Sequence, residues 1–401
     1  MKRIFSNKEV VLGVTGSIAA YKACEIASRL IEYGARVLPV LTQSAAELVA
    51  PASFEAITGQ RAVTRMFEPL QNPEIEHIAV ANRAHLFLIA PATANVLAKT
   101  AHGIADDWLT TTLLATRAPI LFAPAMNCNM YTHPATQENI QTLARRGCRF
   151  VGPEDGRLAC GTTGIGRMID PATIIEACIP LLSTKKDLAG KRVLITSGAN
   201  HEPIDPVRFI GNRSSGKMGR ALVLEALARG AEVTVVSGPS EVRMPWGATV
   251  VGVRSAAEMA EAVGREAPAA DIIIGAAAVA DYRVESPAPE KIKREQDKLT
   301  LTLVQNPDII AGVGARKKSG QYVVGFAAET ENLISNALAK LKRKNLDLIV
   351  ANLVGMPNSD FGTDTVSASL ITPDRHIEDL PVVSKEELAH HLFNHIAAEL
   401  A

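Results

Sequence analysis

Residues suited to binding a phosphorylated ligand follow the first apolar run of the chain. The segment 13–22 carries Gly16 and Ser17 just before a helical pattern, and Thr42 ends the next apolar run. Glycine permits a tight turn, and the free N–H groups at a helix start bind phosphate. The segment lacks a full G-x-G-x-x-G fingerprint. From this loop alone, a capped βα turn and a phosphate site are therefore equally good interpretations.

Two further apolar runs end in Ala-Pro-Ala turns that lead to asparagine, in the segments 90–95 and 123–131. Small residues beside proline let a planar ring approach the backbone, and asparagine amides supply directed hydrogen bonds. Asparagine is also common in ordinary turns. Because the same arrangement occurs at two strand ends, we interpret both segments as parts of one binding site.

A candidate reactive thiol lies in a glycine-rich loop. Cys160 belongs to the segment 157–168 and is followed by three glycines within six positions. Such a loop predicts a flap. Cys24 and Cys178 lie on apolar helical patterns and are expected to be inert core thiols. The sequence assigns no function to four other residues: Cys128, His85, His102 and His133.

The second half contains a near match to a P-loop at residues 211–218. Met218 stands where a hydroxyl should hold magnesium, and the preceding segment 205–210 is a poor parallel strand. A P-loop NTPase is therefore not expected. The glycine and serine amides of this segment remain candidates for binding a phosphate or a carboxylate.

The elements that must position these residues are buried strands followed by helices. Continuous apolar runs predict strands covered on both faces, as in parallel sheets. Helical spacing at 19–33 and 217–229 predicts a βαβ unit at the start of each half. The nine predicted strands are Val10–Val14, Val37–Leu41, Leu86–Ala90, Ile120–Ala123, Val193–Thr196, Val233–Val236, Ile272–Gly275, Tyr322–Phe326 and Leu346–Val350.

This pattern predicts an α/β protein with two doubly wound, Rossmann-like domains whose sheets are mainly parallel. The polar segment 183–190 precedes a new strand, so we place the boundary there and expect domains at 1–185 and 186–401. Ligands of open parallel sheets bind at the carboxyl ends of the strands. The motifs described above follow these strand ends.

Composition limits the classes of function. The 401 residues are 47% hydrophobic and 21% charged, as in a packed soluble protein. Lys and Arg number 42, as do Asp and Glu, so no net charge attracts nucleic acid or an anionic membrane. The first nine residues lack the apolar core of a signal peptide, and no apolar run is long enough to span a membrane. The five scattered cysteines are expected to be reduced thiols, and the location cytoplasmic.

The first half resembles the flavin-dependent cysteine decarboxylases, through segments 16–20, 91–95 and 124–131. The resemblance implies FMN as cofactor and a catalytic role for His77. It also implies that Asn127 holds the substrate carboxylate, that His77 assists proton movement near the thiol, and that Cys160 protonates an enethiolate. The implied FMN contacts are Gly16, Ser17, Ile18, Thr42, Pro91, Ala92, Thr93, Asn95 and Met126.

The second half resembles the phosphopantothenate–cysteine ligases, through segments 205–219, 276–283, 291–293, 306–309 and 325–330. The resemblance implies CTP as the activating nucleotide. It also implies that Asn212 stabilises an acyl-cytidylate, that Arg208 contacts phosphopantothenate, and that Lys291 supports conversion of the intermediate. The implied CTP contacts are Ala276, Ala277, Asp281, Lys291, Pro307, Asp308, Ile309, Ile310, Phe326, Lys340 and Lys344.

The spacing of Lys340 and Lys344 places both on one helix face and suits a triphosphate clamp. Without the resemblance, a solvated basic helix is the preferred interpretation. Mg²⁺ is expected with CTP, although no ligand cluster can be read from the sequence, and phosphate oxygens and water are expected to supply most of its shell.

Together the halves resemble the fused bacterial bifunctional proteins of coenzyme A synthesis. The implied substrates are 4′-phosphopantothenate, L-cysteine and CTP, with no nucleic acid or membrane partner. The implied assembly is a homo-oligomer of trimeric flavin domains and dimeric ligase domains, a dodecamer by analogy. A protein that retains one activity and a flavin-binding regulatory module are the alternatives; His77, Asn127 and Cys160 together disfavour the second.

Overall fold

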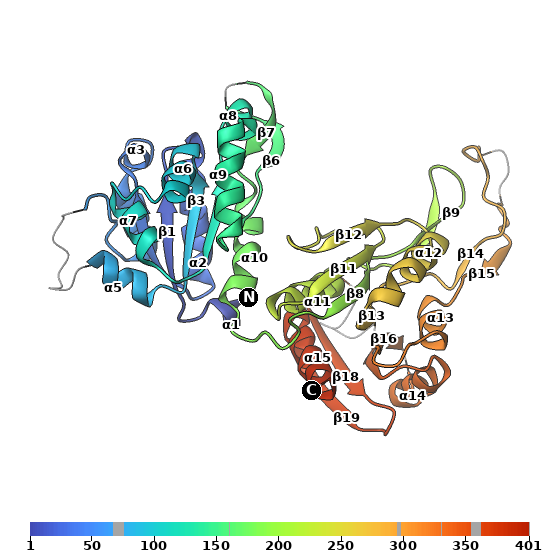
Figure 1. Cartoon of the computed structure of the whole chain (residues 1–401). Helices are drawn as coiled ribbons and strands as arrows, with labels where there is room; N and C mark the ends of the chain where they lie inside the picture. The colour runs from blue at the N-terminus through green and yellow to red at the C-terminus, as the bar shows by residue number, and fades with distance from the viewer. Residues whose placement is uncertain (67–75, 160, 295–297, 330, 354–361, 401) are drawn as a thin grey trace. The chain divides into compact units, whose positions relative to one another are not determined.

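The computed structural model describes residues 1–66, 76–159, 161–294, 298–329, 331–353 and 362–400. The chain divides into two compact units, Met1–Thr184 and Lys185–Ala401. Figure 1 shows that each unit is a sheet flanked by helices. No helix among these residues is both long and apolar enough to cross a membrane.

The first unit is built on a five-stranded parallel sheet in the order β2-β1-β3-β4-β5. The chain passes from β1 to β2 on one side and then crosses back to β3, so the strand order reverses between β1 and β3. A crevice at such a reversal is the usual ligand site of an open α/β sheet. The strands are β1 (Glu9–Val14), β2 (Arg36–Leu41), β3 (Leu86–Ala92), β4 (Ile120–Pro124) and β5 (Arg149–Phe150).

Helices pack on both faces of this sheet, and its strands are therefore buried. Val11 and Ile89 pack in one core with Leu97 of α6 (Ala94–His102) and Leu109 of α7 (Trp108–Ala115). The remaining elements are η1 (Ile18–Tyr21), α1 (Lys2–Phe5), α2 (Lys22–Glu32), α3 (Gln43–Ala46), α4 (Pro51–Thr58), α5 (Glu76–Arg83), α6 (Ala94–His102), α7 (Trp108–Ala115), α8 (Cys128–Thr132), α9 (Pro134–Arg145), α10 (Pro171–Leu182) and the hairpin β6 (Glu154–Arg157) and β7 (Thr163–Arg167).

The second unit is built on an eight-stranded sheet in the order β12-β11-β8-β13-β16-β17-β18-β19. Its order reverses between β8 and β13, and β18 and β19 add antiparallel pairs. The strands are β8 (Arg192–Ser197), β11 (Glu232–Ser237), β12 (Thr249–Gly252), β13 (Ile272–Gly275), β16 (Tyr322–Glu329), β17 (Leu348–Leu353), β18 (Thr365–Ile371) and β19 (Ile377–Ser384).

Two separate cores lie on the two faces of this sheet. One contains Leu222 of α11 and Leu392 of α15, and the other contains Met259 of α12, Val313 of α13 and Leu341 of α14. The helices and small hairpins are α11 (Lys217–Ala228), α12 (Ala256–Glu266), η2 (Ala267–Ala269), α13 (Ile309–Ala315), α14 (Leu333–Arg343), α15 (Lys385–Glu399), β9 (His201–Pro203) with β10 (Phe209–Gly211), and β14 (Tyr282–Val284) with β15 (Leu303–Gln305).

A buried arginine joins the first residues of the second unit to two of its helices. Arg229, at the end of α11, is 1% exposed. It forms ion pairs with Glu225 at 2.8 Å and with Asp187 at 3.0 Å, and it donates to Asn394 of α15 at 2.7 Å. The segment around Asp187 is therefore held by the core of this unit.

All nine predicted strands are present, and both sheets are mainly parallel. The last predicted strand, Leu346–Val350, was predicted to start too early, because β17 begins at Leu348. The first predicted helix begins as a 3-10 turn, η1, before α2. Residues 209–211 pair antiparallel with β9 in a separate two-stranded sheet, which agrees with the rejection of a P-loop. The antiparallel strands β18 and β19 were not predicted.

Candidate active sites

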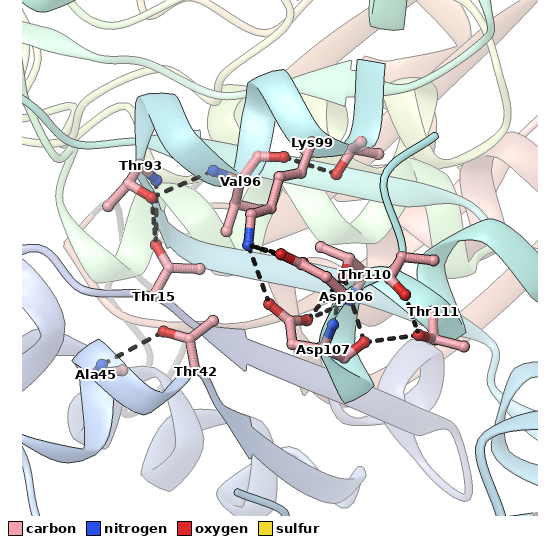
Figure 2. Close-up of polar contacts among 12 residues, drawn as sticks. Thr15, Thr42, Ala45, Thr93, Val96, Lys99, Asp106, Asp107, Thr110 and Thr111 are labelled. Carbon is pink, nitrogen blue, oxygen red and sulfur yellow. Dashed lines mark hydrogen bonds and ion pairs between the residues drawn. The ribbon is translucent and has the colours of Figure 1, made fainter. Parts of the chain in front are cut away.

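The reversal point of the first sheet carries a cluster of hydroxyl groups (Figure 2). Thr15 follows β1 and is completely buried. Its hydroxyl donates to the Pro91 carbonyl at 2.8 Å and accepts from the Thr93 N–H at 3.1 Å. This side chain thus joins the loop after β1 to the end of β3, where the predicted residues Pro91, Ala92 and Thr93 lie.

Three helical elements start at this edge with small hydroxyl residues. Ser17 caps η1, Thr42 caps α3 and Thr93 caps α6, each accepting from a first-turn N–H. The residue before Ser17 has no room for a side chain, since a Cβ on Gly16 would lie 2.5 Å from the Cβ of Ser44. Backbone N–H groups and hydroxyls around a position that only glycine can occupy fit the phosphate of a flavin nucleotide.

The lysine beside this cluster is already neutralised. Lys99 of α6 lies 2.8 Å from Asp106 and 3.9 Å from Asp107, which caps α7 (Figure 2). The Lys99 ammonium lowers the pKa of Asp106 through their hydrogen bond. Ile18 and Asn95, also predicted to contact the cofactor, are exposed at the same edge.

Asn127 begins α8 directly after β4 and accepts from the Asn129 N–H at 2.9 Å. The β6–β7 hairpin packs here: the Met126 N–H donates to the Gly166 carbonyl at 3.0 Å, and a Cβ on Gly164 would lie 3.2 Å from that of Cys128. The predicted thiol, Cys160, lies between β6 and β7 and outside the described residues. The hairpin strands that flank it are thus anchored beside Asn127.

His77 lies on α5, which packs on α7. Figure 1 shows α5 at the end of the first unit opposite α3 and α6. The structure of one chain therefore does not bring His77 to Asn127. The unassigned histidines have structural contacts: His133 caps α9, and His85 accepts from the Glu9 N–H at 3.2 Å.

The second unit has a cavity of about 740 Å³ at the carboxyl edge of its sheet. It lies beside β13 and β16 and between the starts of α11 and α15 and the helices α13 and α14. Eleven predicted residues line it: Asn212, Ala276, Ala277, Asp281, Pro307, Asp308, Ile309, Ile310, Phe326, Lys340 and Lys344.

Both predicted lysines are held by carboxylates at the cavity. Lys340 lies 2.5 Å from Glu329, and Lys344 lies 3.0 Å from Asp308. Lys344 is the C-cap of α14, and its backbone N–H donates to the Lys340 carbonyl at 2.9 Å, so the two lysines are one helical turn apart. A Cβ on Gly314 would collide with the Lys344 carbonyl, so the absence of a side chain there lets α13 approach this lysine.

Asn212 precedes α11, and its side chain is hydrogen-bonded to the loop that follows β13. Its amide donates to the carbonyls of Ala278 and Val279, both at 3.1 Å. On the same loop, the Asp281 carbonyl accepts from the Asn306 N–H at 2.8 Å. These bonds connect the segment before α11 and the segment before α13 to the loop that follows β13.

Arg208 and Lys291 do not line the cavity. Arg208 lies 3.4 Å from the buried carboxylate of Asp205 and donates to the Ile292 carbonyl at 2.9 Å. Burial opposes ionisation of Asp205, but the N–H groups of Val207, Ile292 and Arg208 and the Arg208 charge lower its pKa. Asp205 thus fixes both the Arg208 turn and the loop that carries Lys291.

Sequence reasoning gave no individual role to Asp205, Lys217 or Lys385. Of these three residues, Lys217 and Lys385 line the cavity. The Asp-Pro turn was a usable signal for Asp205, since aspartate often accepts from the N–H two residues on. Lys217 belonged to the rejected P-loop match. Among the described residues, no group of three or more His, Cys, Asp or Glu is placed to hold a metal ion.

Two α/β units, each with a candidate ligand site where its strand order reverses, define a two-part protein, and comparisons with known proteins identify its parts. Residues 2–183 match the family described as Flavoprotein. Residues 188–400 match the family described as DNA/pantothenate metabolism flavoprotein C-terminal domain. The cofactor of the first unit is therefore a flavin.

Full-length relatives give the family. The coenzyme A biosynthesis bifunctional protein CoaBC of Vibrio cholerae is 45% identical over 386 residues, covering 96% of each chain. That of Bacillus subtilis is 44% identical over 399 residues, covering 98% of each. A crystal structure of the C-terminal domain of a CoaBC protein is 38% identical, with a TM-score of 0.46 over 54% of this chain and 98% of that one. The chain belongs to the family of bifunctional enzymes of coenzyme A biosynthesis.

Proposed function

We propose that the second unit ligates L-cysteine to 4′-phosphopantothenate with CTP, and that the first unit decarboxylates the product to 4′-phosphopantetheine with FMN. The observation that carries this proposal is the cavity of the second unit, which collects eleven residues predicted from five separate sequence segments. The two family matches support the same division of labour between the units.

The ligation needs an activated carboxylate, because a free carboxylate has no good leaving group. The carboxylate of 4′-phosphopantothenate attacks the α-phosphate of CTP and releases pyrophosphate, and the cysteine amine then displaces CMP from the acyl-cytidylate. Lys340 and Lys344 exchange Glu329 and Asp308 for phosphate oxygens, and the Asn212 amide faces the acyl-cytidylate. Arg208 and Lys291 act on the phosphopantothenate side.

Mg²⁺ is proposed to arrive with CTP. The described residues present no cluster of carboxylates that fits a resident metal site. Phosphate oxygens and water are therefore its expected ligands, and no step of the ligation is assigned to a protein-bound ion.

In the first unit, a bound flavin would take two electrons from the cysteine side chain, which makes that side chain an electron sink, and would return them to the substrate after carbon dioxide has left. The chain's own residues then act on the substrate. Asn127 holds its carboxylate from the start of α8, Cys160 protonates the enethiolate, and His77 moves the proton of the thiol. The hydroxyl caps formed by Ser17, Thr42 and Thr93 hold the flavin phosphate.

Assembly completes the first site in this proposal. Because α5 lies away from the edge that carries Asn127, His77 is proposed to act in the site of a neighbouring copy. This requires a homo-oligomer of the first unit, for which a trimer is proposed by analogy with the family. The ligase units are proposed to form dimers.

The test uses the purified full chain with 4′-phosphopantothenate, L-cysteine, CTP and Mg²⁺, followed by mass spectrometry. CMP together with 4′-phosphopantetheine is expected, and both disappear when CTP is omitted. CMP with accumulated phosphopantothenoylcysteine would contradict the role of the first unit. ATP replacing CTP at equal rate would contradict the nucleotide assignment, and absence of CMP would overturn the ligase proposal.

A further inference from the structure

Two hairpins of the second unit carry the basic residues that do not line its cavity. Arg208 belongs to the turn between β9 and β10, and Lys291 to the segment between β14 and β15. Figure 1 shows β9, β14 and β15 extending away from the large sheet. β14 contacts β9, and the Ala288 N–H donates to the Ile204 carbonyl at 2.9 Å. No described residue between 285 and 302 belongs to the two cores named above, so hydrogen bonds are needed to hold Lys291 in place.

A single carboxylate holds both segments. Asp205 is 3% exposed. Its Oδ1 atom accepts from the N–H groups of Val207 and Arg208, both at 2.8 Å, and these bonds close the turn. Its Oδ2 atom accepts from the Ile292 N–H at 3.1 Å, which fastens the peptide bond directly after Lys291. The two oxygens of one side chain thus serve two different segments.

Arg208 fastens Ile292 through its other backbone group. The Arg208 guanidinium lies 3.4 Å from the Asp205 carboxylate and donates to the Ile292 carbonyl at 2.9 Å. The N–H and the carbonyl of Ile292 are therefore both bonded to the same turn. Arg208 and Ile292 lie 84 positions apart in the sequence. The turn thus holds together the two basic residues that are predicted to act on the phosphopantothenate side.

The two hairpins are joined at their other end by Asn212. This residue follows β10, and its amide donates to the carbonyls of Ala278 and Val279, shortly before β14. Asn212 lines the cavity together with predicted nucleotide contacts such as Asp281. The nucleotide end of the hairpins therefore has hydrogen bonds of its own. Loss of the Asp205 contacts should affect the acid substrate and leave the CTP contacts in place.

We propose that Asp205 is the positioning residue that keeps Lys291 beside Arg208 for 4′-phosphopantothenate. The inference rests on the proposed function and deepens it, because it assigns control of the acid substrate to a residue that acts only through two others. A carboxylate is needed because both of its oxygens accept, one from each segment. An amide has one acceptor oxygen, and its NH₂ group would face an N–H donor in either orientation.

The kinetic test compares Asp205→Asn with Asp374→Asn in the full chain. Asp374 is the matched control, since it accepts from the Thr372 hydroxyl and the His376 N–H in the turn between β18 and β19 and does not line the cavity. CMP formation is measured while 4′-phosphopantothenate and CTP are varied separately. Asp205→Asn is expected to raise the KM for 4′-phosphopantothenate about tenfold or more, the size of a lost charge-assisted hydrogen bond. The KM for CTP should stay unchanged, and Asp374→Asn should change neither value.

A purely structural role of Asp205 predicts a different pattern. Partial unfolding would lower the amount of active protein and therefore kcat, without separating the two KM values. Equal rises in both KM values, or an unchanged KM for 4′-phosphopantothenate, would overturn the positioning role. Thermal unfolding of each variant verifies that the second unit is folded at the assay temperature.

Limited digestion with trypsin reports on the position of Lys291 without turnover. The peptide bond after Lys291 contains the N–H that donates to Asp205. Cleavage of such a bond in a folded protein requires local opening. Asp205→Asn is expected to speed cleavage after Lys291 about tenfold relative to the wild type and to Asp374→Asn, since a hydrogen bond to a charged group is lost. An unchanged rate, followed by mass spectrometry of the peptides, would overturn the proposal.

Binding of 4′-phosphopantothenate, followed by calorimetry, separates this inference from the proposed function. A wild-type protein that binds the acid but forms no CMP would refute the proposed reaction. The role of Asp205 would still stand if Asp205→Asn released Lys291 to trypsin and weakened binding of the acid about tenfold. Unchanged binding in that variant would refute the role, and a wild type that does not bind the acid would refute both.

Discussion

The two units place their candidate sites at the same topological position but line them with different chemistry. Each site lies where the strand order reverses, between β1 and β3 in the first unit and between β8 and β13 in the second. The first is lined by hydroxyl caps such as Ser17 and Thr93, the second by lysines such as Lys340. One architecture thus presents two chemically different sets of side chains at the same topological position.

The ion pairs show how much positive charge each site offers to a ligand. Lys99 in the first unit contacts two carboxylates, Asp106 and Asp107, so little positive charge remains for a ligand. In the second unit, Lys340 and Lys344 each contact one carboxylate at the cavity. A monophosphate with a large ring is well served by neutral donors and a helix start, whereas a triphosphate needs several exchangeable cations.

The largest expected effect separates the two activities. In the wild type, the carbonyls of Ala278 and Val279 accept from the Asn212 amide. Asn212→Asp places a carboxylate against these carbonyls. We expect CMP formation to fall by about 100-fold or more, from lost hydrogen bonds and charge repulsion. Decarboxylation of supplied phosphopantothenoylcysteine should be unchanged. A parallel fall in both activities would show that the two sites are not independent.

The next effect tests the charge of the second site. Lys340→Met and Lys344→Met are each expected to raise the KM for CTP by about tenfold or more, because a charge-assisted hydrogen bond to phosphate is lost. Lys342→Met is the matched control, since Lys342 is exposed on the same helix and does not line the cavity. Equal effects at all three positions would indicate a general electrostatic attraction of CTP rather than direct phosphate contacts by Lys340 and Lys344.

A smaller effect tests the neutral cluster of the first site. Thr15→Val removes the acceptor of the Thr93 N–H and the donor to the Pro91 carbonyl. We expect a loss of about 1–3 kcal/mol in the free energy of unfolding, together with weaker retention of flavin, followed by its visible absorbance. Thr112→Val is the control, because the buried Thr112 hydroxyl donates to the Trp108 carbonyl within its own helix, α7. Equal flavin loss in both variants would contradict a specific role for Thr15.

The smallest effect concerns the turn that holds Arg208. The folded-state pKa of Asp205 is lowered, so its ionised form stabilises the second unit above the ordinary aspartate pKa of about 3.9. This contribution is lost as the pH falls through the lowered value. Asp205→Asn should therefore be less stable than wild type at pH 7, and the difference should shrink below about pH 4. Urea unfolding at both pH values measures it; a difference that grows in acid would contradict the sign.

The parallel strands were predictable because they are buried on both faces. Runs such as Ile272–Gly275 and Val10–Val14 must be apolar throughout, and few other structures require that. The antiparallel strand β19 escaped prediction because its sequence has no continuous apolar run: Glu378 and Asp379 follow Ile377, and Pro381 interrupts the apolar residues after them. Such a strand depends on its neighbour β18 for pairing, and a single sequence does not show that neighbour.

The regions of the two candidate sites could be predicted because the carboxyl ends of parallel strands meet at one edge of a sheet. The individual residues there, such as Thr93 and Asp281, were predicted from the family resemblance. Lys217 and Lys385 meet only through the packing of α11 against α15. Nothing in the spacing of two lysines so far apart in the chain indicates that both reach residues 362–364. Likewise, the position of His77 depends on the direction in which α5 packs.

The buried Arg229 determines where the second unit can be cut away for separate expression. A fragment that begins at Lys185 keeps Asp187 at 3.0 Å from this guanidinium. A fragment that begins with β8 at Arg192 would retain every strand of the sheet, yet it would leave Arg229 without one of its two carboxylate partners. The sequence boundary of a functional fragment therefore lies several residues before its first strand.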